Sequence, residues 1–264
     1  MIPKKIHYCW FGNGTKPPLA ERCLDSWHKY CPDYEIIEWN EGNYDTSSAP
    51  LYVRQAYENK KWAFVTDFVR LHVVYEEGGI YLDTDVELIK SLDSFLNYSA
   101  FFGFEDNYLV ATGLGFGAEK GASVLKLLMS DYMEIPFVKA DGSLDLLSCP
   151  QRNTEALVKL GLRKDNTMQV LPDNVAVFPT SFFCPLSYRT GIKTITPDTV
   201  SIHWYSASWL PEERRKEHSR RVLKNRLLRP VKTILKKILG KKASGTLKKM
   251  VYGSGEKDRD NPES

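Results

Sequence analysis

The alternation of strand-type and helix-type patterns along the first 90 residues is the feature that most restricts how this chain can fold. Short β-rich runs are separated by segments with helical spacing of apolar residues. Such alternation is typical of an α/β sheet with parallel strands. Strands are predicted at 2–11, 34–39, 80–82, 100–104, 109–111, 114–117, 170–171, 175–178 and 200–204. Helices are predicted at 19–30, 52–57, 62–77, 123–132 and 154–160.

Polar and aromatic side chains gather where three predicted strands end. These groups are Trp10-Phe11-Gly12, Asp83-Thr84-Asp85 and His203-Trp204. Because ligands of α/β sheets bind at the carboxyl ends of the strands, this coincidence indicates an enzyme.

The Asp83-Thr84-Asp85 pattern indicates a divalent cation. Two close carboxylates repel each other, and hard oxygen ligands suit Mg²⁺ or Mn²⁺, which also bridge to substrate phosphates. The following residues do not fit an EF-hand loop. An acidic turn on the surface is the alternative interpretation of these residues alone.

The predicted helix at 62–77 carries polar residues on a largely apolar background. Thr66, Asp67 and Arg70 share one face, and most of the remaining side chains are apolar, which predicts a buried helix. A buried Asp and Arg must be paired or bound to something polar. Either Asp67 and Arg70 form a structural ion pair, or both point into a polar cleft and hold the hydroxyls or phosphates of a ligand.

Three motifs in this order resemble glycosyltransferase family 32, the DXD sugar-transferases. That family includes fungal initiating mannosyltransferases and bacterial capsular-polysaccharide enzymes, and the glucosyltransferase domains of large clostridial toxins are related to it. The similar segments are 2–12 (IPKKIHYCWFG), 66–70 with 77–85 (TDFVR and EGGIYLDTD), and 203–209 (HWYSASW).

The resemblance implies a GT-A fold, which is a Rossmann-like α/β domain, with a nucleotide-sugar donor, Mn²⁺ or Mg²⁺, and retention of the anomeric configuration. Asp67 and Arg70 would bind the donor sugar and phosphate, and Asp83, Asp85 and His203 would hold the metal. Asp67, Arg70, Asp83 and Asp85 would form the catalytic group. The donor would also contact Trp10, Gly12, Asn40, Tyr81, Ser208 and Trp209. Without the motif context, Trp10, Trp209 and His203 would be interpreted as core residues.

The acceptor side is less defined by sequence. The resemblance places 104–117 and 149–154 around the donor sugar and acceptor, with Gln151 and Asn153 as candidate sugar contacts. Loop polarity would also account for both residues. Because no dedicated nucleophile stands out, we favour same-face attack assisted by the leaving phosphate over a covalent enzyme intermediate.

Composition excludes several classes of protein. The five cysteines form no CxxC pair, which argues against a disulfide framework and a zinc ribbon. No apolar run is long enough for a signal peptide or a membrane-spanning helix, so we expect a reducing, cytoplasmic setting. The net charge of +3 argues against a general nucleic-acid binder.

The charge is unevenly distributed along the chain. Residues 211–264 hold 17 basic and 7 acidic residues, a net charge of +10, and residues 1–210 carry a net charge of −7. Apolar residues recur at helical spacing among the basic ones, with Pro230 as a kink or division. Such a segment is typical of binding to an anionic membrane surface, and a helix packed on the domain with a solvated basic face is the alternative.

The sequence therefore predicts a GT-A glycosyltransferase domain at 1–210, a basic amphipathic helical tail at 211–252 and a disordered terminus at 253–264. We expect a metal-dependent retaining enzyme that moves a sugar from a UDP- or GDP-sugar to a glycan acceptor. A lipid-linked capsule or O-antigen precursor at the inner face of the plasma membrane fits the basic tail. The alternative is a toxin-like effector that glycosylates a protein.

Overall fold

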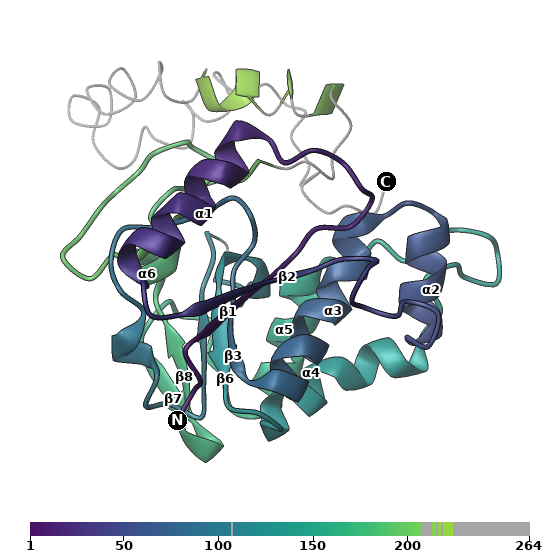
Figure 1. Cartoon of the computed structure of the whole chain (residues 1–264), viewed down its shortest axis with the longest axis horizontal. Coiled ribbons are helices and arrows are strands. Elements are labelled where there is room, and N and C mark those ends of the chain that lie inside the picture. The colour runs from purple at the N-terminus through teal and green to yellow at the C-terminus, as the bar shows by residue number, and fades with distance from the viewer. Residues whose placement is uncertain (107, 207–212, 215, 218, 224–264) are drawn as a thin grey trace, which may run out of the picture. The chain divides into compact units, whose positions relative to one another are not determined.

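A seven-stranded mixed sheet lies at the centre of the computed structural model. The structure describes residues 1–106, 108–206, 213–214, 216–217 and 219–223. One unit comprises Met1–Ser187 with Lys193–Trp209, and a second comprises Tyr188–Ile192 with Leu210–Ser264. The sheet belongs to the first unit and has the strand order β2-β1-β3-β6-β5-β8-β7 (Figure 1).

The strands of this sheet run mostly parallel, with β6 and β7 reversed. They are β1 (Lys5–Cys9), β2 (Glu35–Trp39), β3 (Gly79–Tyr81), β5 (Ala100–Gly103), β6 (Phe116–Ala118), β7 (Gln169–Leu171) and β8 (Val175–Phe178). The helices are α1 (Pro18–Tyr30), α2 (Leu51–Glu58), α3 (Trp62–Glu77), α4 (Ser123–Glu134), α5 (Cys149–Val158) and α6 (Thr180–Phe183). Short 3₁₀ turns occupy Asp93–Phe95, Thr112–Leu114 and Pro172–Asn174.

Side chains of the central strands alternate between two apolar cores. Ile80 and Phe101 face the core that α1 and α6 cover, while Tyr81 and Phe102 face the core that α2, α3, α4 and α5 cover. This period of two is the pattern of strands that are buried on both faces. Figure 1 shows the two groups of helices on opposite sides of the sheet.

A second, two-stranded sheet follows the acidic motif directly. Its strands β4 (Val86–Leu88) and β9 (Ser201–His203) pair antiparallel, with Val86 opposite His203. The sequence predicted 200–204 as a strand but did not predict β4, because a run of three residues is too short to show a period. Trp27 on α1 is fully buried, and its indole N–H donates to the carbonyl oxygen of Val86 at 2.7 Å.

The predicted α/β class is confirmed, and several boundaries differ from the prediction. The proposed strand at 109–111 is wrong: Val110 forms only an isolated bridge to Phe104, and its N–H donates to the Thr154 hydroxyl. The proposed strand at 114–117 begins as a 3₁₀ turn, and only its end belongs to β6. Helix α5 begins at Cys149 rather than 154, since Pro150 fits the first turn of a helix.

All five cysteines are buried free thiols, as their use as small hydrophobes requires. Among the described residues, no helix is long and apolar enough to span a membrane. Most of the predicted tail at 211–252, and all of 253–264, lies outside the described residues, and 219–223 are helical. The division at residues 210 and 211 stays a prediction.

We expect Trp27→Phe to weaken the fold. The change leaves a buried carbonyl oxygen of Val86 without its donor and removes ring volume from a fully buried position. The free energy of unfolding should fall by about 1–3 kcal/mol, measured by urea denaturation. Val170→Ala on the exposed face of β7 is the control, because surface substitutions usually stay within about 0.5 kcal/mol.

Candidate functional site

The site lies where the chain changes direction across the sheet. Strand β1 connects through α1 to β2 on one side, and the chain then returns to β3 on the other side of β1. Such a switch point leaves a crevice outside the carboxyl ends of the strands, where ligands of α/β sheets bind. Trp10, which follows β1, and Asp83, which follows β3, both lie at this edge.

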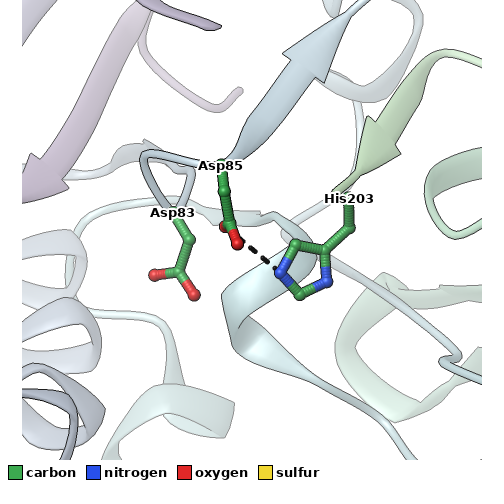
Figure 2. A group of neighbouring side chains, drawn as sticks. All are labelled: Asp83, Asp85 and His203. Carbon is green, nitrogen blue, oxygen red and sulfur yellow. Dashed lines mark ion pairs between the residues drawn. The ribbon is translucent and has the colours of Figure 1, made fainter. Parts of the chain in front are cut away.

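The structure brings Asp83, Asp85 and His203 together. One ligand atom of each lies within 4.8 Å of the others, and His203 Nε2 is 3.2 Å from Asp85 Oδ1 (Figure 2). Backbone pairing explains this proximity, because Val86 lies opposite His203 between β4 and β9. The predicted metal-ligating residues therefore form one group, although His203 lies more than 100 positions after Asp85 in the chain.

The electrostatics of this group favour a cation. Burial alone would raise the pKa of Asp85, but the facing imidazole of His203 and the N–H of Ser206 hold it well below its usual value. Burial would lower the pKa of His203, yet the carboxylates of Asp85 and Asp83 raise it. His203 Nδ1 is buried and has no hydrogen-bond partner among the described residues. Two carboxylates and the facing imidazole nitrogen, His203 Nε2, fit Mn²⁺ or Mg²⁺.

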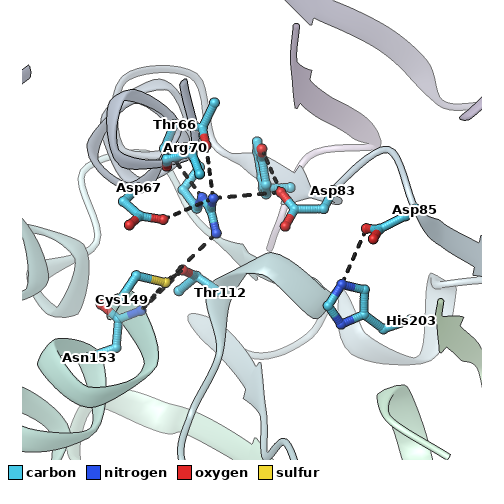
Figure 3. A network of polar contacts seen from close by, with 11 residues as sticks. Thr66, Asp67, Arg70, Asp83, Asp85, Thr112, Cys149, Asn153 and His203 are labelled. Carbon is cyan, nitrogen blue, oxygen red and sulfur yellow. Dashed lines mark hydrogen bonds and ion pairs between the residues drawn. The ribbon is translucent and has the colours of Figure 1, made fainter. Parts of the chain in front are cut away.

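Arg70 on α3 is the most constrained side chain of the site. Its Nε donates to the Thr66 carbonyl oxygen at 2.9 Å, and its Nη2 donates to the Thr66 hydroxyl at 3.0 Å. The same Nη2 is 3.1 Å from Asp67 Oδ1 and 3.7 Å from Asp83 Oδ1 (Figure 3). The guanidinium also lies over the Tyr81 ring, 5.2 Å from its centroid. Arg70 is therefore held in one orientation, facing the DXD carboxylates.

Both interpretations of Asp67 and Arg70 describe part of the structure. The ion pair between them exists, and Arg70 also faces Asp83, which belongs to the acidic motif. Burial raises the pKa of Asp67 to about 6, against the opposing effect of Arg70. Burial likewise raises the pKa of Asp83, while the Tyr81 hydroxyl donates to it at 2.9 Å.

Sequence analysis placed the segments 104–117 and 149–154 near the site, but it did not identify Gly113 or Cys149 within them. A Cβ on Gly113 would lie 2.4 Å from Asp83 Oδ2, so only glycine fits here. Arg70 Nη1 donates to the Cys149 sulfur at 3.8 Å, and Asn153 donates to the Thr112 hydroxyl at 3.1 Å. A glycine before a buried strand and a cysteine at a helix start carry no chemical signal in a single sequence.

Of the two candidate sugar contacts, Asn153 is the better placed. It is fully buried beside Thr112 and Cys149, and its Oδ1 has no partner among the described residues. Gln151 accepts a hydrogen bond from the Ser148 hydroxyl in the first turn of α5. Glu105, which sequence reasoning missed, lies within electrostatic reach of His203, and burial raises its pKa to about 7.

Trp10, Gly12 and Asn40 lie at the ends of β1 and β2. The Trp10 indole is half-buried and donates to the Gly14 carbonyl oxygen at 2.6 Å. Gly12 has a φ of 91°, and a Cβ there would lie 2.8 Å from the Trp62 indole. Asn40 donates to Glu38 and accepts from the Gly42 N–H. Ser208 and Trp209 lie outside the described residues, so their predicted donor contacts stay predictions.

Comparison with known proteins finds a family match for one segment of the chain. Residues 17–102 match the family described as a glycosyltransferase sugar-binding region containing a DXD motif. The chain is similar to inositol phosphoceramide mannosyltransferase 3 of Schizosaccharomyces pombe, at 32% identity over 38% of this chain and 28% of that protein. It is also similar to subversion of eukaryotic traffic protein A of Legionella pneumophila, at 27% identity over 32% of this chain and 17% of that protein.

The chain thus spans less than a third of either relative. Among solved structures, the PaToxG glycosyltransferase has 21% identity and a TM-score of 0.45, over 60% of this chain and 68% of that one. The similarity to known families thus lies in residues 17–102, which match the DXD-containing sugar-binding region of glycosyltransferases.

Proposed function

We propose that the protein is a metal-dependent, retaining glycosyltransferase that uses a nucleotide-sugar donor. The observation that carries the proposal is the Asp83–Asp85–His203 group beside Arg70, at the switch point of the sheet and within the fold unit that holds the sugar-binding region. A diphosphate needs both a divalent cation and a fixed positive side chain, and this edge offers ligands for the first and Arg70 for the second.

Asp83, Asp85 and His203 would hold the ion, Mn²⁺ or Mg²⁺. When bound, a divalent cation supplies Lewis-acid stabilisation of the charge that develops on a leaving diphosphate. The Ser206 N–H and the Tyr81 hydroxyl hold Asp85 and Asp83 in place from the other side. Such supporting contacts orient metal ligands and tune their basicity.

Arg70 stabilises the leaving group. Its guanidinium is fixed by Thr66 and Asp67 before any donor arrives, so it needs no reorganisation as negative charge builds on the departing phosphate oxygen. Preorganised contacts of this kind are typically worth about 3–4 kcal/mol of transition-state stabilisation.

Same-face attack fits the way the carboxylates are used. Asp67 pairs with Arg70, Asp83 accepts from Tyr81, and Asp85 faces His203, so each of these carboxylates is held by a neighbouring side chain. The bond from the anomeric carbon to the diphosphate breaks as the bond from the acceptor oxygen forms on the same face. The acceptor proton passes to the departing phosphate oxygen.

A lipid-linked glycan at the inner face of the plasma membrane is the proposed acceptor. The net charge of +10 on residues 211–264 supports an anionic membrane partner, and one relative is named for inositol phosphoceramide, a lipid. The second candidate is a toxin-like effector that glycosylates a protein, and one relative is named for the subversion of eukaryotic traffic. Sugar transfer to lipid-linked glycans and to protein extracts, compared with one labelled donor, separates the two candidates.

Asp85→Asn should abolish metal-dependent turnover. The substitution keeps the size of the side chain but removes the charge that faces His203. We expect the rate of UDP- or GDP-sugar hydrolysis with Mn²⁺ to fall at least about 100-fold, and chelation should do the same to the unchanged protein. Asp93→Asn, an exposed carboxylate paired with Lys4, is the control. Full activity of Asp85→Asn would contradict the metal assignment.

Arg70→Lys should separate catalysis from folding. Lysine keeps the positive charge that Asp67 and Asp83 require but cannot reproduce the planar fork of donors. We expect kcat to fall about 100-fold or more, with thermal unfolding monitored to count folded enzyme. Glu76→Gln on the exposed face of α3 is the control. A lower Tm with an unchanged kcat per folded molecule would mean that Arg70 is structural.

Membrane binding should depend on the basic tail. Changing Lys236, Lys237, Lys241 and Lys242 to Gln removes about 1 kcal/mol of attraction to an anionic leaflet per residue. Flotation with vesicles that contain phosphatidylserine should show loss of binding, whereas the same change at Lys60, Lys61, Lys126 and Lys164, all exposed, should not. Equal binding of both variants would reject the membrane proposal.

A further inference from the structure

Glu41, which follows β2, holds a buried oxygen that no donor among the described residues satisfies. Its Oε1 accepts the Gly12 N–H at 2.7 Å and lies 3.4 Å from the Tyr57 hydroxyl. Its Oε2 is buried and has no hydrogen-bond partner among the described residues. A buried carboxylate oxygen without a donor is costly, so this atom has capacity for a donor from outside the described part of the chain.

The neighbouring carboxylate of Glu38, by contrast, has hydrogen-bond donors for both of its oxygens. Glu38 lies on β2, three residues before Glu41, and accepts from Tyr8, Lys16 and Asn40. The amide of Asn40 is used within the turn, since it donates to Glu38 and accepts from the Gly42 N–H. The Asn43 amide is likewise used within the turn, since it accepts from the Asn40 N–H and donates to the Glu38 carbonyl oxygen. Among the polar side chains of this turn, Glu41 is the one with a buried, unpartnered oxygen among the described residues.

Glu41 lies where the base of a bound nucleotide would lie if its phosphates were at Asp83. Strands β2, β1 and β3 are parallel neighbours, so Glu41, Gly12 and Asp83 follow the carboxyl ends of three adjacent strands (Figure 1). Adjacent strands lie about 4.8 Å apart, which places Glu41 about two strand spacings from the acidic motif. A nucleoside diphosphate with its phosphates at Asp83 would extend its base along this edge towards Glu41.

Aromatic side chains surround this end of the edge. The Trp62 indole lies against Gly12, whose φ of 91° and contact distance exclude a side chain. The Tyr57 ring packs edge-on against Trp62, with centroids 5.2 Å apart. Flat apolar surfaces beside one unpartnered acceptor suit a heterocyclic base that presents an N–H.

We propose that the Glu41 carboxylate selects the base of the donor. It accepts the imide N–H of uracil (N3) or the equivalent N–H of guanine (N1), and it rejects cytosine and adenine, which present an acceptor nitrogen at that position. This inference rests on the proposed nucleotide-sugar donor and specifies its chemical class.

The test is Glu41→Gln in the full chain, with binding of UDP, GDP, CDP and ADP measured by calorimetry in the presence of Mn²⁺. The amide keeps an acceptor for the Gly12 N–H and offers a donor in place of Oε2. The free energy of a hydrogen bond to a charged group is large enough to change binding affinity roughly tenfold or more. The unchanged protein should bind UDP or GDP at least tenfold more tightly than CDP and ADP. In the variant this ratio should collapse, with CDP or ADP gaining affinity.

Glu35→Gln, an exposed acid at the start of β2, removes the same charge and should leave the preference unchanged. Glu41→Asp keeps the charge but shortens the side chain by one methylene. It should therefore weaken the binding of UDP or GDP without strengthening the binding of CDP. This variant provides the test if Glu41→Gln does not fold. An unchanged base preference in folded Glu41 variants would overturn the inference while leaving the proposed function intact. A folded wild-type protein that binds none of the four nucleotides would overturn both.

Discussion

The burial of the Arg70 guanidinium is the constraint on which the site depends. Arg70 is only 4% exposed, and a charge so far from water persists only when opposite charges and hydrogen-bond acceptors surround it. Thr66 and Asp67 on the same helix and Asp83 after β3 supply them. Because these partners come from two elements, the position of α3 against β3 and the position of the DXD motif are fixed together.

The second constraint is the short pairing of β4 with β9. Asp85 immediately precedes Val86, and Val86 lies opposite His203, so backbone hydrogen bonds rather than side-chain attraction set the spacing of the predicted metal-ligating group, Asp83, Asp85 and His203. Trp27 fixes the same strand from α1 by its bond to the Val86 carbonyl oxygen. The metal-ligating residues therefore rest on a strand pair that is anchored to the core beside the main sheet.

Sequence analysis was correct for features that depend on a local pattern of residues. The alternation of periods gave the α/β class, and the buried face of α3 predicted that Asp67 and Arg70 need partners. It failed for β4, which is too short to show a period, and for the strand proposed at 109–111, where tertiary contacts to Thr154 replace ladder bonds. Gly113 and Glu41 could not be found from one sequence, because their significance lies in a close approach and in a missing partner.

From the charge balance of the site, we propose that a cation is a condition of donor binding as well as of catalysis. Three carboxylates, those of Asp67, Asp83 and Asp85, face one guanidinium and one imidazole. Arg70 faces both Asp67 and Asp83, so part of its charge is offset before a diphosphate binds, and residues 1–210 carry a net charge of −7. Interactions at this depth are poorly screened by water or salt. On this proposal, an anionic donor enters the site together with a divalent ion that offsets Asp83 and Asp85, and metal dependence begins at the binding step.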